Sequence, residues 1–62
     1  MANVTKKKIL FIDDDPGILL TIGDRLQFEG YEVIKAISGE EGLAHLTNTT
    51  PDLILLDISM PG

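Results

Sequence analysis

The chain of 62 residues contains no cysteine, which excludes two kinds of site at once. No disulfide can hold a small core together, and no thiolate can bind a metal or carry redox chemistry. No apolar stretch approaches the roughly 20 residues of a membrane span, and the N-terminus lacks the apolar core of a signal peptide. We therefore expect a soluble, cytoplasmic protein without a membrane partner.

Positive charge is also scarce. Five Lys and Arg residues stand against ten Asp and Glu residues, for a formal net charge of -5. Contacts to nucleic-acid phosphates need clustered Lys and Arg, and the only basic cluster, Lys6 to Lys8, is short and precedes an apolar run. It is typical of a solubilising flank. We expect no nucleic-acid binding by this segment.

Carboxylates are concentrated at the ends of two apolar runs, Ile9 to Asp15 (ILFIDDD) and Leu53 to Gly62 (LILLDISMPG). Such runs are typical of strands in a parallel sheet covered by helices, whose binding sites lie at the carboxyl ends of the strands. If the two strands are neighbours, Asp13, Asp14 and Asp57 converge, although 44 positions (57 minus 13) separate the outer pair. Aspartate is an oxygen ligand for divalent cations and a weak nucleophile that can form an acyl phosphate.

The segment after the first strand predicts a helix. Asp15 is its expected N-cap, with Pro16 in the first turn, and Gly30 is the expected C-terminal stop. Phe28 and Tyr31 are expected to be packing residues near the helix end. The apolar spacing predicts one buried face, made of Ile18, Leu19, Ile22 and Leu26.

A second strand and a second helix follow. The β-branched segment Tyr31 to Ile37 predicts a strand at a sheet edge, and Ser38 with Glu41 forms the pattern of a capping box. The apolar contacts of this helix are expected from Leu43, Ala44 and Leu46. The order strand, helix, strand, helix, strand predicts right-handed crossovers and a parallel sheet.

Three segments, IDDDP, SGEEGL and DLILLDISMPG, stand in an order that resembles the receiver domain of two-component response regulators, chemotaxis regulators included. The resemblance covers nearly all of residues 7 to 62. It implies a phosphoacceptor signalling domain rather than an enzyme, with Asp57 taking a phosphoryl group from a sensor histidine kinase. It also implies a Mg²⁺ site in which Asp14 is a direct ligand, Asp13 acts largely through a bound water, and Asp57 and the backbone carbonyl of Ser59 complete the set.

The resemblance further implies half of a flavodoxin-like fold, namely a three-stranded parallel sheet in the order 2-1-3 with two helices. A complete receiver has five strands, so residues 1–62 are expected to be a partial receiver domain, truncated before the remaining two strands. The family's Ser or Thr after the fourth strand and Lys after the fifth have no counterpart here. Such a fragment is expected to lack full activity.

Two other functions remain open. The chain could be a self-associating assembly fragment without phosphorylation, because a third strand with an open edge and exposed apolar surface favours a second copy. It could also be a phosphohydrolase of the haloacid dehalogenase type, since Asp13 and Asp15 form an Asp-x-Asp pattern. Gly17 stands where that motif needs Thr or Val, and the segment that begins at Asp57 has no role in that interpretation.

Overall fold

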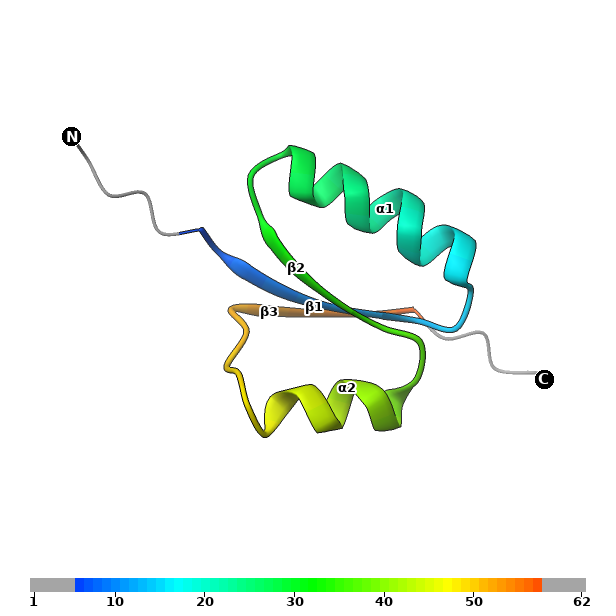
Figure 1. The fold of residues 1–62 in the computed structure, drawn as a ribbon, viewed down its shortest axis with the longest axis vertical. Coiled ribbons are helices and arrows are strands. Elements are labelled where there is room, and N and C mark those ends of the chain that lie inside the picture. The colour runs from blue at the N-terminus through cyan, green and yellow to red at the C-terminus, as the bar shows by residue number, and fades with distance from the viewer. Residues whose placement is uncertain (1–5, 58–62) are drawn as a thin grey trace.

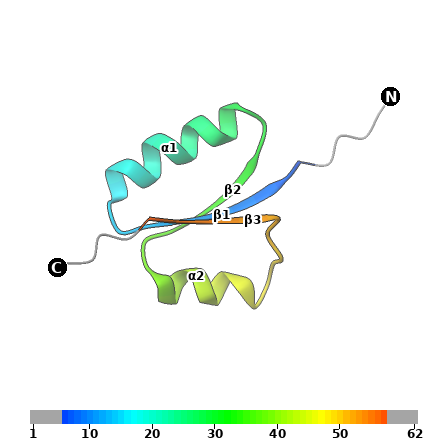
Figure 2. The same ribbon diagram turned by 180° about the vertical axis from the view of Figure 1, so that it is seen from behind.

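The computed structural model describes residues 6–57. Its three strands form one parallel sheet in the order β2-β1-β3. Helix α1 covers one face of this sheet and α2 covers the other (Figures 1 and 2). This arrangement confirms the expected half of a flavodoxin-like α/β fold. The elements are β1 (Lys8–Asp13), α1 (Pro16–Phe28), β2 (Glu32–Ala36), α2 (Gly39–Leu46) and β3 (Leu53–Asp57).

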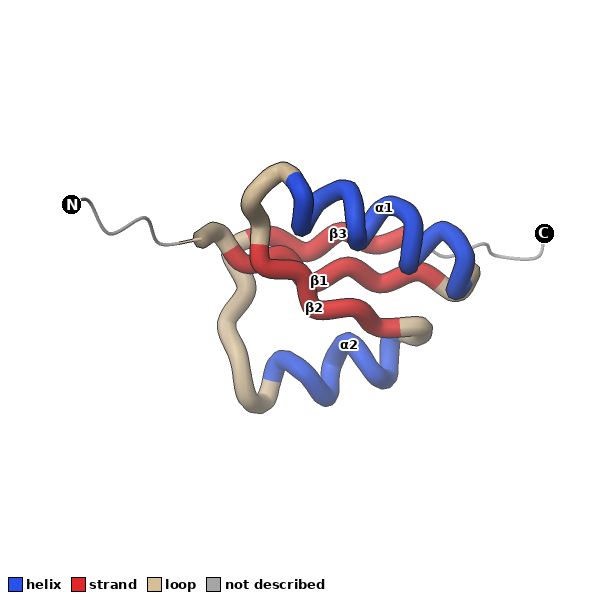
Figure 3. The backbone as a smooth tube through the Cα atoms, turned by 45° about the horizontal axis from the view of Figure 1, so that its top comes forward, coloured by secondary structure: helices blue, strands red, loops and turns tan. Residues whose placement is uncertain are grey.

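Strand β1 lies between the other two strands and supplies the centre of the core (Figure 3). Its alternating side chains divide between the two faces of the sheet, because successive residues of a strand point to opposite sides. Ile9 and Phe11 pack with Leu19 of α1, whereas Leu10 and Ile12 form a second cluster on the opposite face, together with Ala36 of β2. The apolar run of β1 is therefore buried on both faces, as expected.

The start of α1 follows the predicted capping pattern. The Asp15 carboxylate accepts hydrogen bonds from the backbone N–H groups of Gly17, at 2.9 Å, and Ile18, at 3.3 Å. Pro16 occupies the first turn, where its missing N–H removes no helical bond. Asp15 is thus a capping residue, as the sequence predicted.

The end of α1 depends on Gly30, whose φ of 106° lies in the left-handed region that glycine tolerates best. The Gly30 N–H donates to the Gln27 carbonyl at 3.0 Å, and the Tyr31 N–H donates to the Leu26 carbonyl at 3.1 Å. These two bonds form a Schellman motif, which satisfies carbonyls that the last turn leaves free. The turn directs the chain into β2.

The buried face of α1 differs from the prediction. Leu19 and Gly23 are its buried residues, whereas Ile18 and Ile22 are exposed. The reason is that α1 packs over β1 and β2, so its side toward β3 is uncovered within residues 6–57. Phe28 is 87% exposed, and its predicted packing role is wrong. At 100° per residue, Phe28 projects from the side of the helix opposite to the sheet.

The N-terminus of α2 is capped by Ser38, whose hydroxyl accepts a hydrogen bond from the Glu41 N–H at 3.1 Å. The Glu41 carboxylate accepts from the N–H of Ile37, at 3.3 Å, one residue before the position that a capping box would use. The capping prediction is confirmed for Ser38. The return bond is shifted by one residue.

The contact of α2 with the sheet is made at Gly42, the one buried residue that the helix contributes. The predicted contact residues, Leu43, Ala44 and Leu46, are all exposed. A Cβ at Gly42 would lie against the side chain of Ile12. Glycine therefore allows a close approach of helix to sheet, which turns the leucines away from the centre of the contact.

Strand β3 is an open edge, since β1 is its one partner within residues 6–57. The side chains of Leu53, Ile54 and Leu56 are 51%, 47% and 64% exposed. Only Leu55 is packed against the core cluster on the α1 face. Among the helices of the described part, none is long and apolar enough to cross a membrane.

Candidate functional site

The pairing of β1 with β3 brings two of the predicted site residues together. In the parallel register, Ile12 lies opposite Leu56 and Asp13 lies opposite Asp57. Both strands point the same way, so these aspartates share the carboxyl edge of the sheet. The convergence of Asp13 and Asp57 follows the expectation from the sequence.

Asp13 is only 2% exposed, which is unusual for a carboxylate. Its Oδ1 accepts a hydrogen bond from the Asp15 N–H at 2.9 Å. Its Oδ2 is buried and has no hydrogen-bond partner within residues 6–57. A buried polar atom without a partner costs free energy, and the cost is larger for a charged group. A cation at this oxygen would remove the cost.

Asp14 and Asp57 are both exposed and thus accessible from solvent. Asp57 also lies on the rim of an open depression beside the N-terminus of α1. The edge of the sheet therefore offers one buried and two accessible carboxylates. The depression is lined by Asp15, Gly17, Ile18, Thr21, Ile22 and Asp57.

The predicted metal set is only partly described. Ser59 lies outside residues 6–57, so the structure says nothing about its carbonyl. Within the described range, no group of three His, Cys, Asp or Glu side chains is arranged to hold a metal ion. The geometry joins Asp13 to Asp57 through the register and leaves Asp14 as a separate exposed carboxylate.

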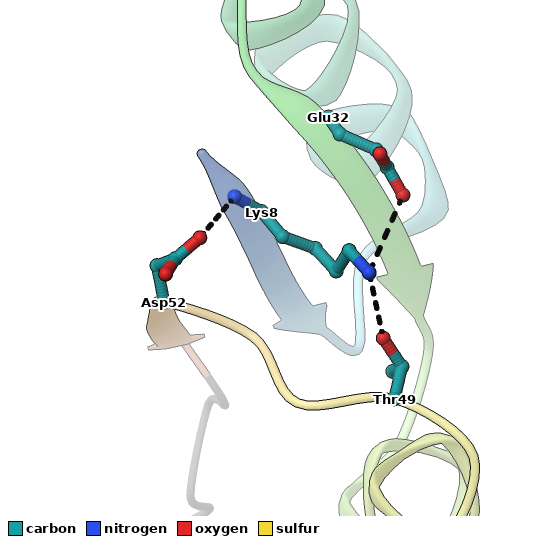
Figure 4. A network of polar contacts seen from close by, with 4 residues as sticks. All are labelled: Lys8, Glu32, Thr49 and Asp52. Atoms are coloured by element: carbon teal, nitrogen blue, oxygen red, sulfur yellow. Dashed lines mark hydrogen bonds and ion pairs between the residues drawn. The ribbon is translucent and has the colours of Figure 1, made fainter. Parts of the chain in front are cut away.

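The sequence reasoning missed a second polar cluster, at the opposite end of the same strand pair (Figure 4). The Lys8 N–H donates to Asp52 Oδ2 at 2.7 Å, and the Asp52 N–H donates to the Lys8 carbonyl at 2.7 Å. The Lys8 Nζ donates to Thr49 Oγ1 at 3.1 Å and lies 3.9 Å from Glu32 Oε2. One signal was available, because Lys8 and Asp52 are 44 positions apart, as Asp13 and Asp57 are.

The structure has a parallel sheet with acidic residues at the carboxyl ends of β1 and β3. Comparison with known proteins identifies the family to which such a chain belongs. The chain belongs to the response regulator receiver domain family, whose model matches residues 9–62. The transcriptional regulatory protein PrrA of Mycobacterium leprae is 43% identical over 60 residues, which are 97% of this chain and 26% of that protein. The transcriptional regulatory protein GlrR of Escherichia coli is 48% identical over 52 residues, 84% of this chain and 12% of that protein.

Solved structures support the same family assignment. A CheY-like receiver domain protein from Methanospirillum hungatei superposes with a TM-score of 0.84 at 46% identity, covering 92% of this chain and 46% of that one. The response regulator TrrA of Thermotoga maritima, solved in complex with Mg²⁺ and BeF, gives a TM-score of 0.79 at 46% identity, covering 90% and 49%. The chain thus spans about a quarter of the length of PrrA from Mycobacterium leprae and about half of these solved chains. The comparisons support neither of the two alternative functions.

Proposed function

We propose that Asp57 accepts a phosphoryl group from a sensor histidine kinase in the cytoplasm, so that the domain is a phosphoacceptor module and not an enzyme. An oxygen of the Asp57 carboxylate attacks phosphorus as the bond from phosphorus to the kinase imidazole breaks. The imidazole nitrogen keeps the electron pair and is then protonated. The observation that carries this proposal is the register that sets Asp57, exposed, beside the buried Asp13.

The proposed site also takes Mg²⁺. Asp13, Asp14, Asp57 and the backbone carbonyl of Ser59 would hold the ion, and all of them offer the oxygen ligands that Mg²⁺ prefers. The Oδ2 of Asp13, which has no hydrogen-bond partner within residues 6–57, supports this fit, because a bound cation would interact with it. When bound, the ion would neutralise negative charge on the phosphoryl group. The chain's own part is to hold the acceptor in place and to shield Asp13 from bulk solvent.

The solved neighbour TrrA, whose structure contains Mg²⁺ with BeF, supports the same assignment. That protein shares 46% identity with this chain in an alignment that covers 90% of this chain and 49% of TrrA. A beryllium fluoride group imitates a phosphoryl group on a carboxylate. The likeness makes BeF with Mg²⁺ a suitable probe for this chain.

The test is a titration of the chain with Mg²⁺, followed by beryllium fluoride and, separately, acetyl phosphate, read by NMR and mass spectrometry. Unmodified chain should bind Mg²⁺ and then form an adduct on Asp57, with only a low yield of phosphorylation from acetyl phosphate. Asp57→Asn should abolish the adduct, whereas Asp24→Asn, a control at an exposed carboxylate on α1, should leave both steps unchanged. An adduct that persists in Asp57→Asn would overturn the acceptor assignment.

We also propose that the 62-residue chain self-associates through β3. This strand leaves Leu53 and Ile54 about half exposed and Leu56 64% exposed, and its outer edge is unpaired within the described residues. A hydrophobic edge strand of this kind is a template for pairing with another chain. Sedimentation velocity over a range of concentrations should show a dimer or larger species, and Ile54→Lys should shift it to monomer. A mass that stays monomeric at every concentration would refute this proposal.

A further inference from the structure

We propose that Lys8 and Asp52 are positioning residues that set the register of β3 against β1 and thereby hold Asp57 opposite Asp13. The inference rests on the proposed function in one respect, since it takes the carboxylate edge as the site that is being positioned. The pair lies at the amino end of the two strands, at the far end from Asp13 and Asp57.

The need for such a pair comes from the hydrophobic pattern of the strands. In a strand with one buried face, a slip of one residue turns apolar side chains to solvent, so the pattern itself specifies the register. Here residues 9–12 (ILFI) and 53–56 (LILL) are apolar at every position. A slip of β3 by one residue would exchange one aliphatic side chain for another at three of these four positions and would bring Asp52 or Asp57 to the fourth. The apolar contacts therefore discriminate poorly between registers.

The polar contacts between Lys8 and Asp52, by contrast, distinguish the observed register from a slipped one. Both backbone groups of Lys8 are bound to Asp52, its N–H to the carboxylate and its carbonyl to the Asp52 N–H, each at 2.7 Å. A slipped β3 would remove the carboxylate from the Lys8 N–H and leave both groups to find other partners. Charge-assisted hydrogen bonds of this kind are about twice as strong as neutral ones.

The spacing along the two strands links the pairing of Lys8 with Asp52 to the pairing of Asp13 with Asp57. Lys8 precedes Asp13 by the same number of residues as Asp52 precedes Asp57, so pairing at one end implies pairing at the other. A slip of one residue would move Asp57 along the strand by about 3.3 Å. Metal sites tolerate deviations of about 0.2 Å in ligand distance, so the slipped chain would lose the shared site.

The Lys8 side chain extends the same contact to two further segments (Figure 4). Its amine donates to Thr49 Oγ1 in the loop between α2 and β3, at 3.1 Å, and it approaches Glu32 of β2 at 3.9 Å. The bond to Thr49 holds the chain just before β3 begins. The approach to Glu32 is a partly exposed ion pair and adds little.

The experiment compares three variants of the 62-residue chain. Asp52→Ala removes the acceptor, Asp52→Asn keeps an oxygen that can accept from the Lys8 N–H, and Asp24→Ala removes an exposed carboxylate that pairs with Lys35 away from β3. Cross-strand NMR contacts between Ile12 and Leu56 report the register directly. Titration with Mg²⁺, under conditions in which every variant is folded, reports the affinity of the site, which a role in stability alone would then leave unchanged.

In Asp52→Ala, we expect the contacts of Ile12 with Leu56 to be lost or split among several registers. The Mg²⁺ affinity should fall about 10- to 100-fold, as when other residues that orient metal ligands are removed. Asp52→Asn should restore both readouts, and Asp24→Ala should alter neither. If Asp52→Ala folds only with an osmolyte such as trimethylamine N-oxide, all four proteins are measured in it.

Unchanged contacts between Ile12 and Leu56 in Asp52→Ala would overturn the proposal. So would an Asp24→Ala variant that loses as much Mg²⁺ affinity as Asp52→Ala does. Failure of the proposed function would look different, because the unmodified chain would then bind no Mg²⁺. In that case the NMR contacts still decide whether Lys8 and Asp52 set the register.

Discussion

The sharpest test of the packing compares alanine at two buried helix glycines, Gly23 and Gly42. In both helices the replacement gains helix propensity, by about 0.8–1.0 kcal/mol. The added methyl group, however, meets different surroundings. At Gly23 the nearest atom is Lys35 Cε, at 2.5 Å, on a flexible and partly exposed side chain. At Gly42 the nearest atoms belong to Ile12, with Cγ1 at 3.0 Å.

The two neighbours can respond differently. Lys35 can swing aside at the cost of its exposed ion pair with Asp24, about 0.2–1 kcal/mol, which roughly cancels the gain in propensity. Ile12 is 7% exposed and enclosed in the core, so the helix or the sheet must shift. Such overpacking costs about 1–3 kcal/mol. We expect Gly23→Ala to be neutral or stabilising by up to about 1 kcal/mol, and Gly42→Ala to be destabilising by roughly 1 kcal/mol.

Thermal unfolding by circular dichroism measures the difference. For a domain of this size, 1 kcal/mol shifts Tm by roughly 4–8 °C, so the two variants should differ by at least that amount. Urea unfolding provides a second measurement at a fixed temperature. Equal stability of the two variants would show that α2 does not approach the sheet through Gly42, and the packing argument would be wrong.

Three further outcomes are expected. Asp13→Asn removes a buried charge and should raise the stability of the metal-free chain by about 1 kcal/mol, while abolishing its stabilisation by Mg²⁺. Thermal unfolding with and without the ion measures both effects, and a lower Tm of the metal-free variant would contradict the prediction. Asp15→Ala removes the cap of α1 and should cost about 1 kcal/mol with little change in Mg²⁺ affinity, so a large loss of affinity would mean that Asp15 is a ligand. Leu10→Ala, at a fully buried position, should cost about 2–5 kcal/mol in urea unfolding, more than Leu53→Ala at the exposed edge, and equal losses would refute the assigned core.

The residues that begin and end the helices could be predicted from the sequence because they act locally. Asp15, Ser38 and Gly30 act through backbone groups within three residues or through their own φ angle, so neighbouring residues suffice to identify them. The apolar runs likewise determine strands of a parallel sheet, and the acidic residues after them identify the edge where the site forms.

The buried faces of the helices could not be predicted in the same way. A periodic pattern of apolar residues predicts which face of a helix is buried. Gly23 and Gly42, however, are buried because the helices come closest to the sheet there. That approach depends on side chains of other elements, Lys35 and Ile12. The exposure of Ile22 follows from the position of α1 over β1 and β2.

The site shows the same division. The sequence by itself determined that carboxylates stand at the ends of two strands, because that depends only on residue order. The tertiary structure decided that Asp13 is buried while Asp57 is exposed, because within residues 6–57 β1 is the central strand and β3 is an edge strand. In the same range, Asp13 Oδ2 has no hydrogen-bond partner. It also decided which residue of β3 lies opposite Asp13. Residues 9–12 and 53–56 are all apolar, so in our proposal the register depends on contacts such as that between Lys8 and Asp52. These two residues are distant in sequence and meet only in the folded sheet.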